Sequence, residues 1–236
     1  MNLKPNKSSN LKMLEFVAEK LGDLCDKLVF LGGCATALLI IDQFAPDARY
    51  TIDVDCIIDV ISIRDYNHIG KKLRKKGFKQ SIEDSVICRW RIGDIIFDIM
   101  PTDEKILGFS NKWYKSAIMY ASRFSLDNGQ IIKLVTPPYF LATKLEAFKN
   151  RGNNDYFASH DLEDALSVLD GRPEVVEEIQ KSDAGIKKYL SESFKRLMDD
   201  PFFQDALPGH LSYNLAIQNE RVIIIRDRIY KIIEAK

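Results

Sequence analysis

The chain has 236 residues, of which 46% are hydrophobic and 29% charged, the proportions of a globular protein with a sizeable core. Its 34 Lys and Arg residues balance 34 Asp and Glu residues, which excludes a protein that coats nucleic acid through overall charge but not one with a local basic patch. The four cysteines form no C-x-x-C pair, and the three histidines are too dispersed for a zinc site. No apolar run approaches the roughly 20 residues of a membrane span, and the N-terminus lacks the apolar core of a signal peptide. We therefore expect a soluble, cytoplasmic protein without a membrane partner.

The first part of the chain alternates helical and strand patterns. In chain order we first predict a helix over residues 11–24, a strand over 27–31 and a helix over 34–44 that is ended by Pro46. A strand from Asp53 to about Ile61 follows, and then a helix over 65–76 that is closed by Gly77. The last elements are a β-hairpin of residues 86–91 and 95–100 around Gly93-Asp94, a helix over 113–123 and a strand over 131–135. This pattern predicts a mixed α/β sheet domain over residues 1–136.

From Pro137 onward the pattern is almost entirely helical. The clearest segments are residues 138–149, 159–169, 173–181, 186–198 and 220–234, with Ser159 as an N-cap and Pro173 in a first turn. We predict a helical domain over residues 137–236, so the whole chain is expected to have an α+β architecture.

Two aspartates, Asp53 and Asp55, lie one residue apart in a segment typical of a buried strand. Strand side chains alternate between faces, so both carboxylates project to the same side. Two like charges are best tolerated there with a cation between them, and oxygen-only ligation suits Mg²⁺ or Mn²⁺. The alternative is a strand whose polar face is merely solvated, and the pair alone does not exclude it.

A glycine pair, Gly32-Gly33, lies between the first strand and the following helix. Backbone N–H groups and the helix dipole favour an anion at such a place, and glycine lets the backbone approach a phosphate closely. The alternative is a tight turn without a ligand. Combined with the carboxylate pair on the next strand, the glycines would hold a nucleoside triphosphate and its metal ion.

A third carboxylate, Asp98, lies in an otherwise apolar strand. Burying a carboxylate without a partner costs several kcal/mol, so either a cation or donors lie nearby or the side chain faces solvent at the hairpin edge. If the hairpin packs beside the strand of Asp53 and Asp55, Asp98 completes a metal-binding triad.

The residues so far resemble a known pattern. Gly32-Gly33, a helix and then residues 49–55 (Arg-Tyr-Thr-Ile-Asp-Val-Asp) resemble the G-G…R-x-T-x-D-h-D pattern of the nucleotidyltransferase superfamily. The long interval between glycines and acids, and the segments 144–152 and 159–164, are similar to the AbiEii/AbiGii toxin-type branch. The resemblance covers about residues 30–172. It implies a polymerase-β-like nucleotidyltransferase sheet domain followed by a helical C-terminal domain.

The resemblance also assigns roles to single residues. Asp53 and Asp55 would bind the divalent metal ions, and either Asp98 or Asp161 would help to activate the acceptor hydroxyl. Lys144 would contact the nucleotide phosphates, which suits an ammonium group acting as a point charge. From the residues alone, Lys144 is better interpreted as a solvated helix lysine, and Asp161 is equally an acid favoured by a helix N-terminus.

Two further positions concern the nucleotide. Cys34 stands where many members of the superfamily have Ser or Thr after the glycine pair. A thiol is a weak donor, so we expect a weaker side-chain contact to phosphate while the backbone contacts are kept. Arg49 either anchors a phosphate or braces the strand that carries the aspartates.

The strongest charge cluster is the segment 71–79 (Lys-Lys-Leu-Arg-Lys-Lys-Gly-Phe-Lys). It is typical of a solvated helix face, and the other interpretation is contact with the phosphate backbone of an RNA acceptor. Arg89 and Arg91 would share one strand face with Trp90 on the other, and they either face the nucleotide or form surface pairs.

The sequence thus predicts an enzyme, a Mg²⁺- or Mn²⁺-dependent nucleotidyltransferase that moves an NMP from an NTP to an acceptor hydroxyl. The resemblance implies a toxin of a toxin–antitoxin or phage-defence system, with an RNA such as tRNA or a protein as acceptor and an antitoxin protein as partner. Two alternatives stay open: a nucleotide-sensing or partner-binding module on the same fold, and a small-molecule nucleotidyltransferase that modifies an antibiotic.

Overall fold

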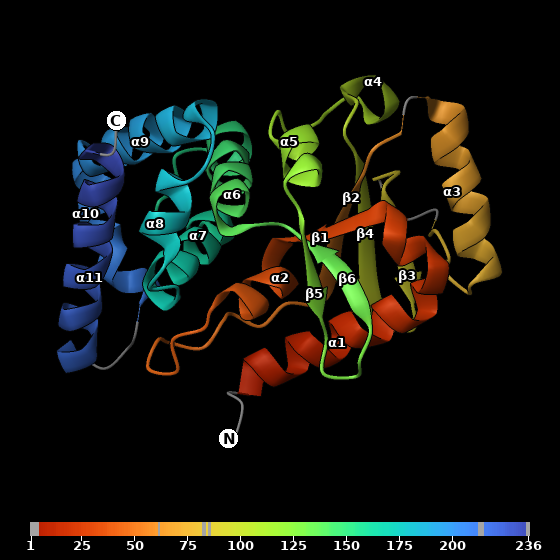
Figure 1. Cartoon of the computed structure of the whole chain (residues 1–236), viewed down its shortest axis with the longest axis horizontal. Coiled ribbons are helices and arrows are strands. Elements are labelled where there is room, and N and C mark those ends of the chain that lie inside the picture. The colour runs from red at the N-terminus through yellow and green to blue at the C-terminus, as the bar shows by residue number, and fades with distance from the viewer. Residues whose placement is uncertain (1–4, 61, 82–83, 85, 212–214, 235–236) are drawn as a thin grey trace. The chain divides into compact units, whose positions relative to one another are not determined.

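The structure is a computed structural model that describes residues 5–60, 62–81, 84, 86–211 and 215–234. The chain forms two compact units, Met1–Ala37 with Arg49–Thr136 and Leu38–Ala48 with Pro137–Lys236. Figure 1 shows the sheet of the first unit and the helices of the second. The segment Leu38–Ala48, which the sequence analysis includes in the first domain, is grouped here with the helical unit.

The first unit is built on a six-stranded mixed sheet with the strand order β3-β4-β2-β1-β6-β5. Neighbours β1–β2, β3–β4 and β5–β6 are antiparallel, whereas β2–β4 and β1–β6 are parallel. The predicted hairpin is confirmed, because β3 and β4 pair with Ile92 opposite Ile95. The strands are β1 Leu28–Leu31, β2 Asp53–Ile58, β3 Arg89–Ile92, β4 Ile95–Pro101, β5 Ser122–Ser125 and β6 Ile131–Leu134.

One face of this sheet forms the core of the first unit. Phe30, Cys56, Trp90 and Phe97, each on a different strand, are buried on this face. Helix α3 covers the face at the β3 edge, since a Cβ on Gly70 would lie 3.2 Å from the Trp90 ring. The helical elements of the unit are α1 Pro5–Leu21, η1 Gly22–Lys27, α3 Ile63–Lys75, α4 Glu104–Leu107 and α5 Tyr114–Met119, and α2 Gly32–Leu39 begins in it (Figure 1).

Helix α3 shows why its sequence forms an amphipathic helix. The side-chain oxygen of Ser62 accepts a hydrogen bond from the backbone N–H of Asp65, which satisfies one of the free donors of the first turn. Tyr66, Ile69 and Leu73 are buried at helical spacing, whereas the opposite face carries charged side chains. The apolar stripe faces the sheet, so the basic residues of the segment point to solvent.

The second unit is helical. Helix α6 packs against α7 and α9, and α11 packs against α7, α8 and α9. The side chain of Ser159 caps α7, as the sequence predicts. The elements are α6 Pro137–Arg151, α7 His160–Gly171, α8 Val175–Gln180, α9 Ala184–Met198, α10 Pro201–Ala206, η2 Leu207–His210 and α11 Leu215–Glu234. Among the helices within the described ranges, none combines the length and apolarity needed to cross a membrane.

The segment Leu38–Ala48 is held within the helical unit by backbone and ionic contacts. The N–H groups of Ile41 and Asp42 both donate to the carbonyl of Gly171, at 2.9 Å each. The guanidinium of Arg221 on α11 lies 2.9 Å from the carboxylate of Asp42 and 2.7 Å from that of Asp170. These contacts explain why α2 ends at Leu39 and the predicted helix to residue 44 is wrong.

Several other element boundaries differ from the prediction, among them the start of α8 at Val175 and not at Pro173. The helix predicted over residues 113–123 ends at Met119, and Ser122–Ser125 instead forms β5 opposite β6. The turn between β5 and β6 contains Gly129 with a φ of +84°, so formation of the β5–β6 hairpin overrides the local helical pattern. The strand predicted to reach Ile61 ends at Ile58, and Ile61 lies outside the described residues.

Candidate active site

Three carboxylates project from the sheet face opposite to the aromatic core of the first unit. Asp53 and Asp55 are two residues apart on β2, so their side chains share this face. In the parallel pair β2–β4, Asp55 lies directly opposite Asp98. Asp53 and Asp55 are half-buried, whereas Asp98 is only 8% exposed. The hairpin thus lies beside the aspartate strand, which is the condition that the sequence analysis set for a triad.

The third carboxylate already has a cation. The guanidinium of Arg89 on β3 donates two hydrogen bonds to Asp98, from Nε at 3.0 Å and from Nη2 at 2.8 Å. The hydrogen bonds and charge of Asp98 raise the pKa of Arg89 above its ordinary value, against the opposing effect of burial. Such a parallel two-bond pair is among the stronger charge-assisted contacts. Asp98 is therefore engaged by Arg89, a partner that the sequence pattern did not identify.

The glycine pair meets the carboxylate face at the start of α2. A Cβ placed on Gly32 would lie 1.9 Å from Oδ2 of Asp55, and Gly32 has a φ of +76°. A Cβ on Gly33 would lie 2.6 Å from Nη2 of Arg49. Gly32 therefore excludes any larger residue, because the Asp55 side chain fills the space that a Cβ would need, whereas a Cβ on Gly33 would require the Arg49 guanidinium to shift. The turn, the carboxylate and the guanidinium form one compact cluster.

Asn10 supports this cluster from α1, and the sequence analysis missed it. Its side-chain amide donates to the carbonyl of Arg49 at 2.9 Å and accepts from the backbone N–H of Thr51 at 3.3 Å. The hydroxyl of Thr51 in turn donates to the carboxylate of Asp53. Asn10 is fully buried, and a polar residue on the apolar face of a helix was the signal that could have revealed it.

The side chain of Cys34 lies in the core of the first unit. The residue is fully buried, and its Sγ–H donates to the carbonyl of Asn10 at 3.3 Å. Any anion contact at the start of α2 therefore depends on backbone N–H groups rather than on this thiol.

The two remaining predicted site residues lie together in the helical unit. The ammonium of Lys144 on α6 lies 2.6 Å from Asp164 and 3.3 Å from Asp161, both on α7. Arg151 donates two further hydrogen bonds to Asp161, at 2.9 and 3.0 Å. Burial alone would raise the pKa of Asp161, but the hydrogen bonds of Arg151 and the charge of Lys144 outweigh it and hold the pKa below its ordinary value. The charge of Lys144 is thus compensated within its own unit.

Asp53, Asp55 and Asp98 are the residues of the carboxylate face that could hold a divalent metal ion. Within the described ranges, no group of three His, Cys, Asp or Glu side chains is arranged to hold one ion, and Asp98 is bound by Arg89. Asp53 and Asp55 nevertheless supply oxygen donors on one face beside a glycine turn. Mg²⁺ in nucleotide sites is held by one or two carboxylates, with water and substrate phosphates as the other ligands, so this pair fits such an ion.

The six-stranded mixed sheet and the helical second unit define an α+β fold. No family model and no curated protein matches the sequence. The antibiotic-resistance factor ANT(2'')-Ia in solution is similar over 82% of this chain and 97% of its own, with a TM-score of 0.50 and 12% sequence identity. A crystal structure of an antigenic nucleotidyltransferase-like protein from Paracoccidioides brasiliensis covers 84% of this chain and 94% of its own, with a TM-score of 0.47 and 20% identity. At such identities the likeness concerns the fold alone, and the likeness to ANT(2'')-Ia confirms the predicted fold class.

Proposed function

We propose that the protein is a nucleotidyltransferase that moves an NMP from an NTP to the hydroxyl of an acceptor. The acceptor oxygen forms a new bond to the α-phosphorus, the bond from that phosphorus to the β-phosphate oxygen breaks, and pyrophosphate leaves. The hydroxyl proton passes to a carboxylate base. The observation that supports this most is the contact of Asp55 with Gly32, because it joins a carboxylate pair to a helix N-terminus suited to phosphate.

Each residue of the cluster has a distinct task in this proposal. Asp53 and Asp55 would hold Mg²⁺ or Mn²⁺, which when bound neutralises charge on the triphosphate. The backbone of Gly32-Gly33 and the guanidinium of Arg49 would bind phosphate oxygens. Of the two carboxylates proposed as base, Asp98 is the one that shares the face of the proposed metal ligands.

The proposed reaction is tested by label transfer. The purified protein is incubated with each of the four α-labelled NTPs, Mg²⁺ and separate fractions of RNA, protein and small-molecule antibiotics. We expect label in one acceptor class with wild type and none with Asp53→Asn or Asp55→Asn. Asp94→Asn, an exposed aspartate in the β3–β4 turn, is the matched control and should retain activity. Equal labelling by wild type and Asp55→Asn would contradict the proposal.

The acceptor class separates the biological alternatives. The fold likeness to an antibiotic-resistance factor favours testing an antibiotic acceptor first among small molecules. Labelled RNA or protein, together with growth arrest on expression that Asp53→Asn relieves, would support a toxin of the AbiEii/AbiGii type with an antitoxin partner. Tight NTP binding without labelling of any acceptor would instead favour the nucleotide-sensing module.

A further inference from the structure

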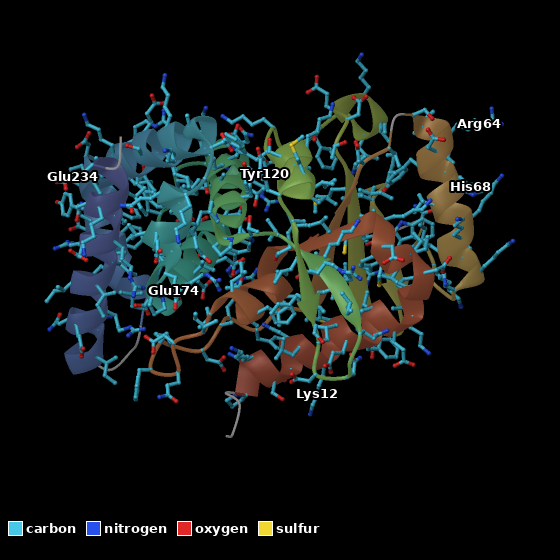
Figure 2. The ribbon with its side chains drawn as sticks, viewed as in Figure 1. Lys12, Arg64, His68, Tyr120, Glu174 and Glu234 are labelled. Atoms are coloured by element: carbon cyan, nitrogen blue, oxygen red, sulfur yellow. The ribbon has the colours of Figure 1, made fainter. Side chains whose placement is uncertain are left out.

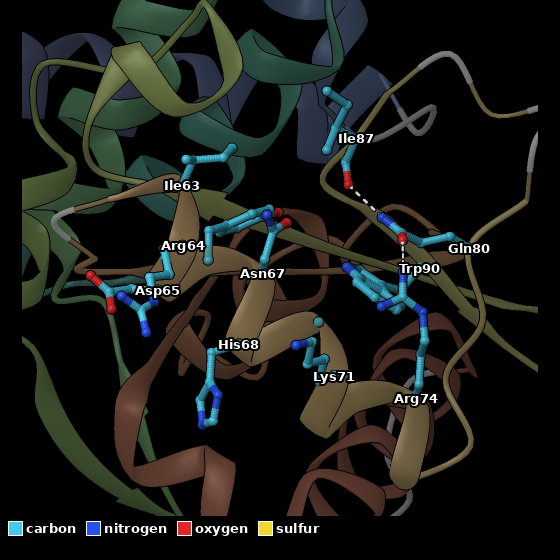
Figure 3. Close-up of a pocket in the computed structure, with 12 residues that line it drawn as sticks. Ile63, Arg64, Asp65, Asn67, His68, Lys71, Arg74, Gln80, Ile87 and Trp90 are labelled. Atoms are coloured by element: carbon cyan, nitrogen blue, oxygen red, sulfur yellow. Dashed lines mark hydrogen bonds between the residues drawn. The ribbon is translucent and has the colours of Figure 1, made fainter.

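A groove of about 720 Å³ runs along α3 in the first unit. Helix α3 contributes Arg64, His68, Lys71 and Arg74, the segment that leads into β3 contributes Gln80, and β3 itself contributes Trp90 (Figure 3). Arg64 and His68 project from the solvent side of α3 in Figure 2. None of these residues has a role in the proposed transfer reaction.

The groove lies on the side of the sheet away from the carboxylates. Trp90 projects from β3 in the direction opposite to Arg89, because neighbouring strand residues alternate. Arg89 binds Asp98 on the carboxylate face, whereas Trp90 lies under α3. The groove is therefore separate from the site proposed for the triphosphate, and the sheet lies between them.

Positive charge is concentrated at this groove. Residues 64–79 contain seven Lys or Arg residues and one acid, Asp65, a net charge of +6 in a chain whose total is zero. The remaining residues of the chain therefore carry a net charge of −6. Such an asymmetry in a neutral protein directs anions to one surface, and it cannot be explained as a general need for solubility.

The cations of the groove are available to a ligand. Arg64 and Lys71 are exposed and form no ion pair with any residue that the structure describes. Arg74 is held in place, since its guanidinium donates to Gln80 at 2.7 Å and lies 5.2 Å from the centre of the Trp90 ring (Figure 3). A cation that is already ordered loses less entropy when it binds an anion.

The spacing of the cations selects an extended anion. Arg64 and Lys71 are seven residues apart, which places them about 10 Å apart along the helix axis, and Arg74 extends the row by about 5 Å. A single phosphate group cannot reach all three positions. A polymer that carries a charge on every repeating group can reach all three positions. In a nucleic acid, amide groups such as that of Gln80 can also donate hydrogen bonds to the sugars and bases.

We propose that this groove binds the phosphodiester backbone of a nucleic acid strand. Its function is to anchor the strand to the first unit at a distance from the carboxylate face. The proposal concerns binding alone, so it does not depend on the proposed transfer reaction.

Binding is tested with a fluorescein-labelled RNA and a DNA strand of the same sequence, each of about 20 nucleotides, by fluorescence anisotropy at several salt concentrations. The test variant is Arg64→Ala/Lys71→Ala. The matched control is Lys12→Ala/Lys27→Ala, which removes two exposed cations from the same unit, Lys12 on α1 (Figure 2) and Lys27 on η1. RNA and DNA arms show whether the 2′-hydroxyl contributes to recognition.

We expect wild type and control to bind with affinities that fall as salt rises. The test variant should bind roughly tenfold more weakly at about 0.1 M salt, and the slope of log affinity against log salt should become smaller by about 1 to 2. Equal affinities of test and control variants would overturn the proposal. Equal competition by polyglutamate at matched charge would also overturn it, since an acidic protein segment would then be the ligand.

The outcomes separate this proposal from the proposed function. If the protein transfers NMP but binds neither strand, the proposed function stands and this inference is refuted. If the protein binds a strand through Arg64 and Lys71 but transfers no label, this inference stands and the proposed function is refuted.

Discussion

Arg89 binds Asp98 through two parallel hydrogen bonds while Asp98 lies directly opposite Asp55 in the sheet. The guanidinium of Arg89 therefore binds the carboxylate that would otherwise complete a metal-binding triad with Asp53 and Asp55. The cluster in this state offers a metal ion two carboxylates, and the third is held by a cation. Arg89 is consequently the residue through which the metal affinity of this face can be adjusted.

We predict that Arg89→Ala increases the affinity for Mn²⁺ roughly tenfold, because a positive charge is removed and Asp98 is released. Calorimetric titration of Mn²⁺ measures the change without any need for turnover. Arg91→Ala is the matched control, since Arg91 lies on the same strand face but pairs with Asp84 at 2.9 Å. Equal Mn²⁺ affinities of wild type and Arg89→Ala would show that Asp98 is no ligand.

Gly32→Ala should abolish nucleotidyl transfer and lower the free energy of unfolding. The new Cβ would clash with Asp55, whose nearest oxygen lies 1.9 Å from its position, and it would strain a residue with φ of +76°. Gly108→Ala isolates the second effect, because Gly108 has φ of +80° and nothing lies within 4 Å of its Cβ position. We expect Gly108→Ala to cost about 1–2 kcal/mol and to leave activity intact. Chemical denaturation and label transfer measure both effects, and similar losses in both variants would refute the importance of the Asp55 contact.

Lys144→Met should destabilise the helical unit by about 3–5 kcal/mol, because it removes the cation that pairs with the buried carboxylate of Asp164. Asp164, which is 1% exposed, is the most affected. Lys144→Met/Asp164→Leu should recover part of this loss, since the uncompensated charge is then removed. Urea denaturation of wild type, both single variants and the double variant gives the coupling energy. Additive effects would mean that the Lys144–Asp164 pair contributes little.

The stability contributed by Asp161 should be lost in acid. Its pKa in the folded protein is lower than its ordinary value, so its contribution is complete above the unfolded pKa of about 3.9 and disappears as pH falls through the lower folded pKa. The difference in unfolding free energy between wild type and Asp161→Asn, measured from about pH 7 to about pH 2, should therefore shrink below about pH 4. Glu163→Gln, whose carboxylate pairs with the exposed His160, is the control on the same helix. A difference that does not change with pH would contradict the assignment.

Patterns of alternation predicted much of the first unit. The placement of Asp53 and Asp55 on one strand face, the β3–β4 hairpin and the fold class all follow from local periodicity and from the order of the motifs. These features depend on residues close together in the sequence, so the chain reveals them directly.

Partners distant in sequence or on separate elements were not predictable in this way. The sequence analysis placed Arg89 and Arg91 on one face but could not choose between nucleotide and surface contacts, and only the register of β3 on β4 pairs Arg89 with Asp98. Asn10 contacts residues about 40 positions away, at 39 and 41 residues of separation, through a helix that no pattern places against the motif strand. Side-chain pairing of this kind is set by tertiary register and not by local propensity. The roles of the site residues stay predictions.

The grouping of residues 38–48 with the helical unit has a consequence for folding. The polypeptide passes between the two units at three places, after Ala37, after Ala48 and after Thr136. A fragment that ends at Thr136 would carry Ile41 and Asp42 without the Gly171 carbonyl that accepts their N–H groups, and the complementary fragment would leave Arg221 without Asp42. These residues all belong to the helical unit, so a cut of the chain at Thr136 divides that unit, and a fragment that contains the whole of it must include residues 38–48.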